Sequence, residues 1–460
     1  MAEQLDGAVS VQASGATSVL ERMRVAALAD VHLVDTPPEE RFDRITRLAK
    51  LIFGVPIAQI NLLGQFESFT KSPQVAGESA TMSVDDTFCN ITIQTPGMLV
   101  VPNLTQDDRF SSRLPVTGEQ HIRFYAGRPL SLGDDLRIGT LCIVDTEPRE
   151  MTPAELNVLD EMGLWVEREL RDSRDPDGEE GADALGASIP TAPTPPVSTF
   201  TTPTSTAPTP TAPIPTSSAV IPNVPTLTAA IVLPAGLADA PVLTPASLAV
   251  ATPTFSISGT SLPLRKIGSD FFAWREVDGV VELTVADVMG KGAKAAAIAS
   301  TVRDTLQDHA GADVGETLHN ANADLARDLH LVGIFATLFH ARVEVETGIL
   351  EYADAGHGLT LIVRADGGVE RLESSGFPLG LLPRGTWEVR STILQEGDVL
   401  VSFTDGVLGL FDGSLASLDK VVDLVRSSSS TSDIVNRVVR LTKRKRGGDD
   451  VTIIAMSRKE

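Results

Sequence analysis

The chain has 460 residues, enough for two or three domains, and its 42% apolar and 22% charged residues are ordinary for a water-soluble fold. Its charge is strongly negative, because 61 Asp and Glu outnumber 38 Lys and Arg and give a net charge of −23. Such a surface is repelled by nucleic acid and by anionic membranes, so we expect neither as a partner. No signal peptide and no run of about 18 apolar residues is present, so we expect a cytoplasmic protein.

The two cysteines, Cys89 and Cys142, are too few for a disulfide framework or a cysteine-based zinc site. Both have apolar neighbours, so we interpret them as buried thiols. A covalent tetrapyrrole or a redox sensor at Cys89 is the less favoured alternative.

After a flexible N-terminus of residues 1–20, residues 21–175 are expected to form an α+β sensor domain. Apolar residues at helical spacing predict an amphipathic helix that ends near Gly54, namely Phe42, Ile45, Ala49 and Ile52. Strand-like runs follow at 58–63, 98–101, 121–126 and 137–144. The domain closes with a second helix, in which Thr152 is the N-cap, Pro153 the first residue and Glu155 part of a capping box.

Three segments of this region have a familiar wording: VVPNLTQDDRF at 100–110, IRFYAGRPL at 122–130 and RIGTLCIVD at 137–145. Together they resemble a GAF domain of the kind attached to bacterial signalling enzymes, over about residues 25–172. The resemblance implies a sensor domain that could bind a small molecule, whose identity varies among such domains.

Residues 176–261 are expected to be a linker, because Pro, Thr, Ala and Ser dominate them. Frequent prolines remove backbone donors and restrict the residues before them, so neither helix nor sheet is expected from about Gly178 to Thr260. Such a segment favours extended, polyproline-II-like backbone. Its more apolar second half, around Ile231 and Val250, could dock on a neighbouring domain.

The last region, residues 262–460, places aspartates where four strand-like runs break into turns. They are Asp270 in GSDF, Asp287 in DVMGKG, Asp405 in TDG, and Asp449 with Asp450 in GDDVT. A single Asp is most often only a turn residue. Four such segments in succession instead favour a site for hard divalent cations, which prefer oxygen ligands. Two such ions about 4 Å apart would polarise a phosphoryl group and activate a water.

The order of these segments, with Ala355-Gly-His357 between the second and the third, resembles the SpoIIE-type branch of the PPM (PP2C-like) serine/threonine phosphatases. The resemblance covers about residues 262–457. It implies an antiparallel β-sandwich of two sheets flanked by helices, with two Mn²⁺ or Mg²⁺ ions at one end. Departures from the family motifs, such as Ser269 and Met289, remove no predicted ligand.

The resemblance also implies roles for individual residues. Asp287 would bridge both ions, and the carbonyl of Val288 would complete one coordination shell. Asp270 would ligate an ion or hold a water beside it, so Asp270 and Asp287 are the catalytic candidates. His357 is expected to be structural, with a role as metal ligand as the alternative.

Asp405 and Asp449 would each ligate an ion alongside the bridging carboxylate. Asp450 either orients its neighbour Asp449 or replaces it as the ligand, and the sequence leaves both open.

The leading functional hypothesis is a metal-dependent phosphoprotein phosphatase controlled by the GAF domain. The resemblance implies a phosphorylated anti-anti-sigma-like protein as the substrate. Two alternatives remain: a phosphatase fold that survives as a weakly catalytic docking module, and a ligand receptor in which the phosphatase domain is secondary. Because prolines interrupt any rigid helix between the domains, control would require direct contact between them, and the helix after Gly292 is the expected place.

Overall fold

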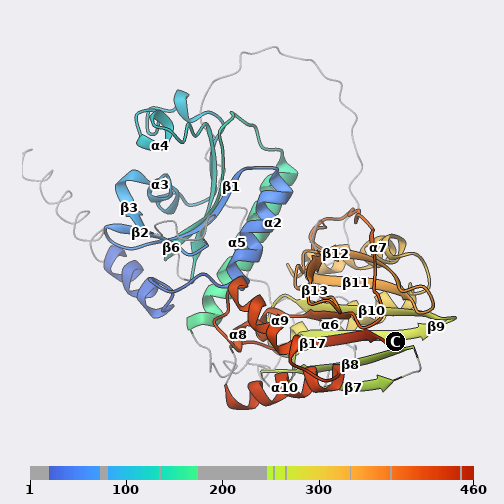
Figure 1. The fold of residues 1–460 in the computed structure, drawn as a ribbon. Coiled ribbons are helices and arrows are strands. Elements are labelled where there is room, and N and C mark those ends of the chain that lie inside the picture. Colours follow the sequence, from blue (N-terminus) through green and yellow to red (C-terminus); the bar gives the residue numbers. More distant parts are fainter. Residues whose placement is uncertain are drawn as a thin grey trace, which may run out of the picture.

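The computed structural model describes residues 20–72, 81–133, 136–174, 246–251, 254–264, 267–331, 333–372, 376–445 and 448–459. These ranges hold three antiparallel sheets, one in an N-terminal domain and two in a C-terminal domain (Figure 1). The predicted flexible N-terminus and most of the predicted linker lie outside them. The expected mixture of helices and antiparallel sheets is confirmed.

The N-terminal domain has a six-stranded sheet of order β3-β2-β1-β6-β5-β4. A helical segment at 20–30 precedes its other elements. These are α2 (Glu40–Phe53), β1 (Ile57–Leu63), β2 (Glu67–Thr70), β3 (Thr81–Ser83), α3 (Cys89–Gln94), β4 (Leu99–Val101), α4 (Leu114–Thr117), β5 (Phe124–Ser131), β6 (Arg137–Asp145) and α5 (Pro153–Arg174).

Both predicted helices of this domain are confirmed together with their end signals. Gly54 caps α2 in a left-handed conformation with φ of 59°, which glycine adopts without steric cost. At the start of α5 the amide of Glu155 donates to Thr152 Oγ1 at 3.2 Å, and the amide of Thr152 donates to Glu155 Oε2 at 2.7 Å. This reciprocal pair is the predicted capping box.

The C-terminal domain is a sandwich of a five-stranded sheet, β15-β12-β11-β10-β9, and a six-stranded sheet, β14-β13-β16-β17-β8-β7. Its strands are β7 (Ala246–Ala251), β8 (Phe255–Leu262), β9 (Asp270–Val277), β10 (Val280–Val288), β11 (Ala336–Glu344), β12 (Ile349–Ala355), β13 (Thr360–Val363), β14 (Val369–Leu372), β15 (Arg390–Ile393), β16 (Val399–Phe403) and β17 (Val451–Arg458). Its helices are α6 (Gly292–Asp308), α7 (Val314–Leu331), α8 (Asp405–Gly409), α9 (Leu418–Arg426) and α10 (Thr431–Arg444).

The linker prediction is wrong at its C-terminal end. β7 and β8 lie within the range 176–261, and β8 pairs with β17 along its whole length. The segment from 254 to 262 contains no proline, and its apolar residues Phe255 and Ile257 are buried in the sandwich. The C-terminal domain therefore begins near residue 246 rather than at 262.

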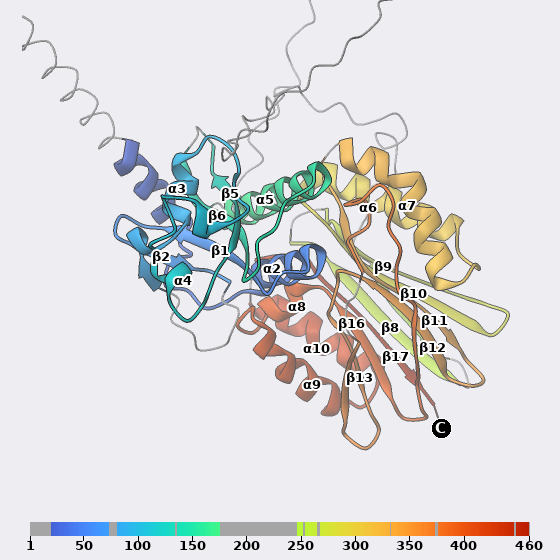
Figure 2. The same cartoon turned by 90° about the horizontal axis from the view of Figure 1, so that it is seen from above.

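Apolar side chains from both sheets fill the centre of the sandwich. Phe339 of β11 is fully buried there, and its ring lies 5.6 Å from that of Tyr352 on the neighbouring strand. Helices α9 and α10 cover the outer face of the six-stranded sheet with a second apolar cluster, while α6 and α7 pack on the other sheet (Figure 2). The sandwich is thus clamped between two helical layers.

The two domains share an apolar cluster. Figures 1 and 2 place α2 and α5 between the N-terminal sheet and the C-terminal domain. At this junction Trp165 of α5 meets Phe335 edge-on, with ring centroids 4.7 Å apart, and the backbone amide of Glu40 donates to the Gly413 carbonyl at 2.8 Å. The two helices therefore serve both as the N-terminal core and as the docking surface.

In the part of the chain that the structure describes, no helix has the length and apolar character needed to cross a membrane.

We predict that Phe339→Ala weakens the C-terminal domain, because it empties a fully buried aromatic site at the centre of the sandwich. Losses of this kind cost about 3–5 kcal/mol in the free energy of unfolding. Urea unfolding followed by circular dichroism measures the change. Ile393→Ala on β15, where the side chain is 51% exposed, is the control and should change little; equal effects of the two substitutions would contradict this account of the core.

Candidate metal centre

The four predicted aspartate segments converge where the two sheets of the sandwich meet at one end. Asp270 is the first residue of β9, and Asp287 lies directly opposite it in register near the end of β10. From the other sheet, Asp405 follows β16, while Asp449 and Asp450 precede β17. The four segments thus approach one another from two sheets, as the motifs predict.

Asp270 and Asp287 form a cross-strand pair of like charges, which is unfavourable while both are ionised. Burial, reinforced by the charge on Asp287, holds the pKa of Asp270 well above its usual value. Burial would also raise the pKa of Asp287, but the adjacent guanidinium of Arg44 lowers it below its usual value. The pKa values of the two carboxyl groups are therefore shifted in opposite directions, as expected for a coupled pair.

The loops that carry Asp405 and Asp450 are tied together at very short range. The amide of Thr404 donates to the Thr452 carbonyl at 3.0 Å, and the amide of Thr452 donates to Thr404 Oγ1 at 3.2 Å. A Cβ on Gly406 would lie 1.8 Å from the Asp450 carbonyl oxygen. Glycine follows Asp405 because no side chain fits between the two loops.

Asp449 and Asp450 have different surroundings. Asp450 accepts the amides of Leu264 at 2.7 Å and Ser269 at 2.8 Å, and burial together with the charge on Asp449 raises its pKa. Asp449 is 31% exposed and faces Lys291 Nζ at 3.5 Å. This arrangement favours Asp449 as the metal ligand and Asp450 as the residue that fixes the loop before β9.

Two other residues of the motifs are held by the core. His357 is buried, its amide donates to Asp354 Oδ1 at 2.6 Å, and its Nε2 lies 3.4 Å from Ser402 Oγ. Burial lowers its pKa to about 4, so the ring is neutral at pH 7. The side chain of Val288 is fully buried and has no atom that binds a metal, so its backbone carbonyl is the only candidate ligand of this residue.

An arginine that the sequence did not mark completes the cluster. Arg44 projects from α2 of the N-terminal domain, and its Nη1 contacts Asp287 Oδ2 and lies 3.5 Å from Asp405 Oδ2. Its other nitrogen, Nη2, is 3.4 Å from Glu169 Oε1 of α5. The only sequence signal is that this charged residue lies on α2 beside the predicted apolar positions Phe42 and Ile45.

The donor set fits hard divalent cations. All its side-chain donors are carboxylate oxygens, and Asp405 Oδ2 is buried with no hydrogen-bond partner among the described residues. Burial raises the pKa of Asp405 to about 8 against the opposing effect of Arg44, which marks a carboxyl group short of positive charge. As the described side chains stand, no three acidic, His or Cys residues gather closely enough to hold an ion.

A cavity of about 450 Å³ lies against this cluster, between the two domains. Asp405 and Asp449 border it from the C-terminal domain, and Glu39, Arg41 and Asp172 border it from the N-terminal domain. The cavity borders the side chains of Asp405 and Asp449, whereas Arg44 covers Asp287.

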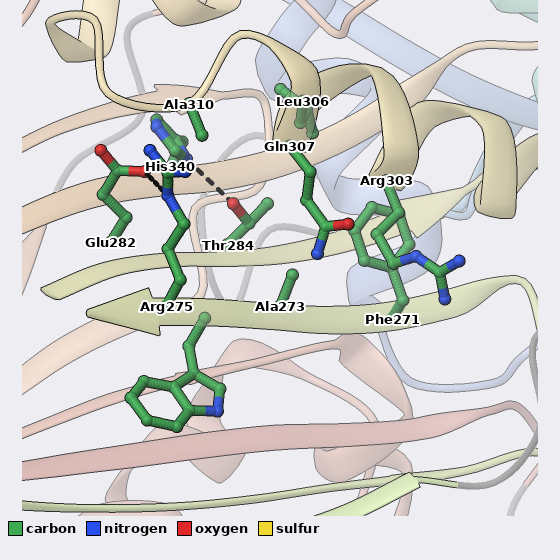
Figure 3. A pocket seen from close by; sticks show the side chains of 11 residues that line it. Phe271, Ala273, Arg275, Glu282, Thr284, Arg303, Leu306, Gln307, Ala310 and His340 are labelled. Atoms are coloured by element: carbon green, nitrogen blue, oxygen red, sulfur yellow. Dashed lines mark hydrogen bonds and ion pairs between the residues drawn. The ribbon is translucent and has the colours of Figure 1, made fainter. Parts of the chain in front are cut away.

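A second hollow, of about 30 Å³, lies between the five-stranded sheet and the end of α6 (Figure 3). Glu282 there accepts from Arg275 Nε at 2.7 Å, and His340 Nδ1 lies 2.9 Å from Thr284 Oγ1. His340 Nε2 is buried with no hydrogen-bond partner among the described residues. A cavity of this size holds a water rather than a substrate.

A sandwich of two antiparallel sheets with carboxylates at their common end is the arrangement that the motifs predicted for a PP2C-like phosphatase domain. Residues 277–459 match the family model described as stage II sporulation protein E (SpoIIE). This part of the chain is therefore similar to the SpoIIE-type domains.

Two curated relatives and one solved structure show how far the likeness extends. Phosphoserine phosphatase RsbU of Bacillus subtilis is 27% identical over 213 residues, covering 44% of this chain and 63% of the relative. Cyclic di-GMP phosphodiesterase PA2567 of Pseudomonas aeruginosa is 33% identical over 129 residues, 28% of this chain and 22% of the relative. The RsbU and RsbW domains of Rv1364c from Mycobacterium tuberculosis are 28% identical with a TM-score of 0.42, covering 47% of this chain and 63% of that one. The chain spans less than two thirds of each of these proteins.

We predict that Asp449→Asn changes metal binding, whereas Asp450→Asn changes stability. Asp449→Asn should weaken Mn²⁺ binding and leave the thermal midpoint nearly unchanged, because its carboxylate is partly exposed. Asp450→Asn should lower the free energy of unfolding by about 1–3 kcal/mol, because an amide replaces a carboxylate that accepts two backbone N–H groups. Calorimetric Mn²⁺ titration and thermal unfolding of both variants distinguish the two roles; the reverse pattern would assign the ligand to Asp450.

We also predict a loss of stability in mild acid that originates at His340. Burial lowers its pKa from 6.5 to about 4 in the folded state, so the unfolded state binds the proton more tightly as pH falls from 6.5 toward 4. At pH 5 this costs about 2 kcal/mol relative to pH 7.5. His340→Gln should lose that much less stability than the wild type when urea unfolding at the two pH values is compared, and an equal loss would show that His340 is not the source.

Proposed function

We propose that the chain is a metal-dependent protein phosphatase that hydrolyses phosphoserine or phosphothreonine, with its N-terminal domain in control of the site. The observation that carries the proposal is the convergence of Asp270, Asp287, Asp405 and Asp449 at one end of the SpoIIE-type domain. The name of the relative RsbU, a phosphoserine phosphatase, supports the same reaction.

Two Mn²⁺ or Mg²⁺ ions would be held mainly by Asp287, Asp405 and Asp449, with the Val288 carbonyl in support. Bound there, the ions supply the positive charge that a phosphoryl group needs in its transition state and make a water nucleophilic at neutral pH. Asp270 faces Asp287 across the strands and would ligate an ion or hold a water beside it. Asp450 keeps the loop before β9 in position through its two backbone contacts.

The substrate that we propose is a phosphorylated regulatory protein of the anti-anti-sigma type. A protein substrate suits a site that lies at the end of the sandwich, which α2 and α5 cover in this arrangement. For the N-terminal domain we propose a sensor of the GAF type with a small-molecule ligand, in line with the resemblance of residues 100–145. Its α2 and α5 touch the site directly, so a change in that domain reaches the carboxylates without passing through the linker.

The alternative is a domain that keeps the fold but only docks a partner. The complete set of carboxylates argues against it, since a binding module has no need of four aspartates brought together from two sheets.

The decisive experiment is phosphate release from a phosphoserine protein and from para-nitrophenyl phosphate, with Mn²⁺ and with a chelator. We predict Mn²⁺-dependent turnover that Asp287→Asn abolishes, because the bridging carboxylate serves both ions. Asp278→Asn is the matched control: it lies at the opposite end of the same β9–β10 hairpin, where φ is 52°, a value that Asn tolerates. Turnover retained by Asp287→Asn, or absent from the wild type with every cation, would rule out the proposed site.

A further inference from the structure

We infer that the N-terminal domain competes with the divalent cations for the same carboxylates, with the Arg44 guanidinium standing where a cation would bind. This inference rests on the proposed function and names how that site is regulated. The docked arrangement would then be a metal-excluding, inactive form, and metal binding would require α2 to withdraw.

The first observation is where the guanidinium sits. Arg44 Nη1 contacts Asp287, the proposed bridging ligand, and lies 3.5 Å from Asp405, a second proposed ligand. The Arg44 side chain is only 9% exposed. A guanidinium that occupies the space between two proposed metal ligands excludes an ion from the same oxygens.

The second observation is that the N-terminal domain holds this arginine in place. The guanidinium carbon lies 5.0 Å from the centre of the Trp165 ring, and Glu169 accepts from both Arg44 Nη2 at 3.4 Å and Trp165 Nε1 at 3.1 Å. Stacking on an aromatic face and a fixed carboxylate are the contacts that orient a planar guanidinium. Trp165 and Glu169 of α5 therefore fix the orientation of the Arg44 side chain.

A second cation extends the same arrangement to the third ligand. Lys291, the residue before α6, lies 3.5 Å from Asp449 and 3.4 Å from Asp172 of α5. Asp172 thereby draws Lys291 into the space between the domains. In the docked form each of the three proposed ligands, Asp287, Asp405 and Asp449, thus faces a side-chain cation.

The charge balance makes this arrangement reversible. Arg44 brings one positive charge to three buried acidic groups, Asp287, Asp405 and Glu169, whereas two divalent cations would bring four. Asp405 Oδ2 is buried with no hydrogen-bond partner among the described residues, so the docked form leaves the cluster short of positive charge. Metal binding and docking are then linked equilibria, and each weakens the other by the same factor.

Docking also closes the approach for a protein substrate. Helices α2 and α5 lie against one end of the sandwich (Figure 2), and Arg44 of α2 contacts Asp287 there. The apolar contact of Trp165 with Phe335 and the hydrogen bond from Glu40 to Gly413 hold them there. A signal that loosens this contact would free the cation site and the substrate surface together.

The test is Mn²⁺ binding by the full-length chain, measured by isothermal titration calorimetry. Arg44→Met keeps an unbranched apolar side chain but removes the charge, and we expect it to bind Mn²⁺ roughly tenfold more tightly than the wild type, a typical coupling between linked sites. Arg128→Met is the matched control. Arg128 also pairs with a buried carboxylate, Glu167, which keeps Arg171 as a partner, and neither residue contacts a proposed ligand.

A second measurement uses the unmodified chain and does not depend on how the variant folds. Small-angle X-ray scattering should show a larger radius of gyration with saturating Mn²⁺ than with a chelator, because the ion displaces Arg44 and releases the domain. Equal Mn²⁺ affinity of the wild type and a folded Arg44→Met, or an unchanged radius at saturation, would overturn the competition while leaving a metal-dependent phosphatase intact. Absence of Mn²⁺ binding in every variant would overturn the proposed function as well.

Discussion

Carboxylates packed together away from water repel one another, and each must gain a proton, a donor or a cation to remain buried. Most of the groups around the aspartate cluster of this protein supply such a partner. Asp450 accepts two backbone amides, Asp270 has a raised pKa beside Asp287, and Asp287 and Asp405 face Arg44. The sheet register and the close approach at Gly406 thus bring the carboxylates together, and the docking of α2 supplies a positive charge beside them.

Local signals in the sequence predicted the elements that local physics decides. The capping box at Thr152 and the left-handed cap at Gly54 depend on residues a few positions apart. They can therefore be predicted without knowledge of any tertiary contact. The aspartate motifs likewise predicted that four loops share one end of a sandwich. The choice between Asp449 and Asp450 could not be made, because it depends on the amides of Leu264 and Ser269, far away along the chain.

Two features escaped the sequence for different reasons. β7 and β8 follow a long stretch rich in Pro and Thr, and their many small residues give little strand signal in the sequence. They are strands in the structure because β8 pairs with β17 and β7 pairs with β8. Arg44 was missed because its partners come from another domain, 243 positions away in the case of Asp287. From sequence alone, a charged residue beside the apolar face of a helix is interpreted as facing solvent, because the domain that packs on it is not known.

The position of β17 in its sheet bears on how the chain is made. This strand lies between β16 and β8, so residues 451–458 form the middle of the six-stranded sheet rather than its edge. During synthesis the N-terminal domain can fold early, but the sandwich lacks its central strand until residue 458 has left the ribosome. For that interval β8 and β16 have no partner between them, and the α2–α5 surface has no finished domain to cover. The carboxylates of β9 and β10 then emerge long before those beside β17, so the four aspartate segments come together only once β17 has joined the sheet.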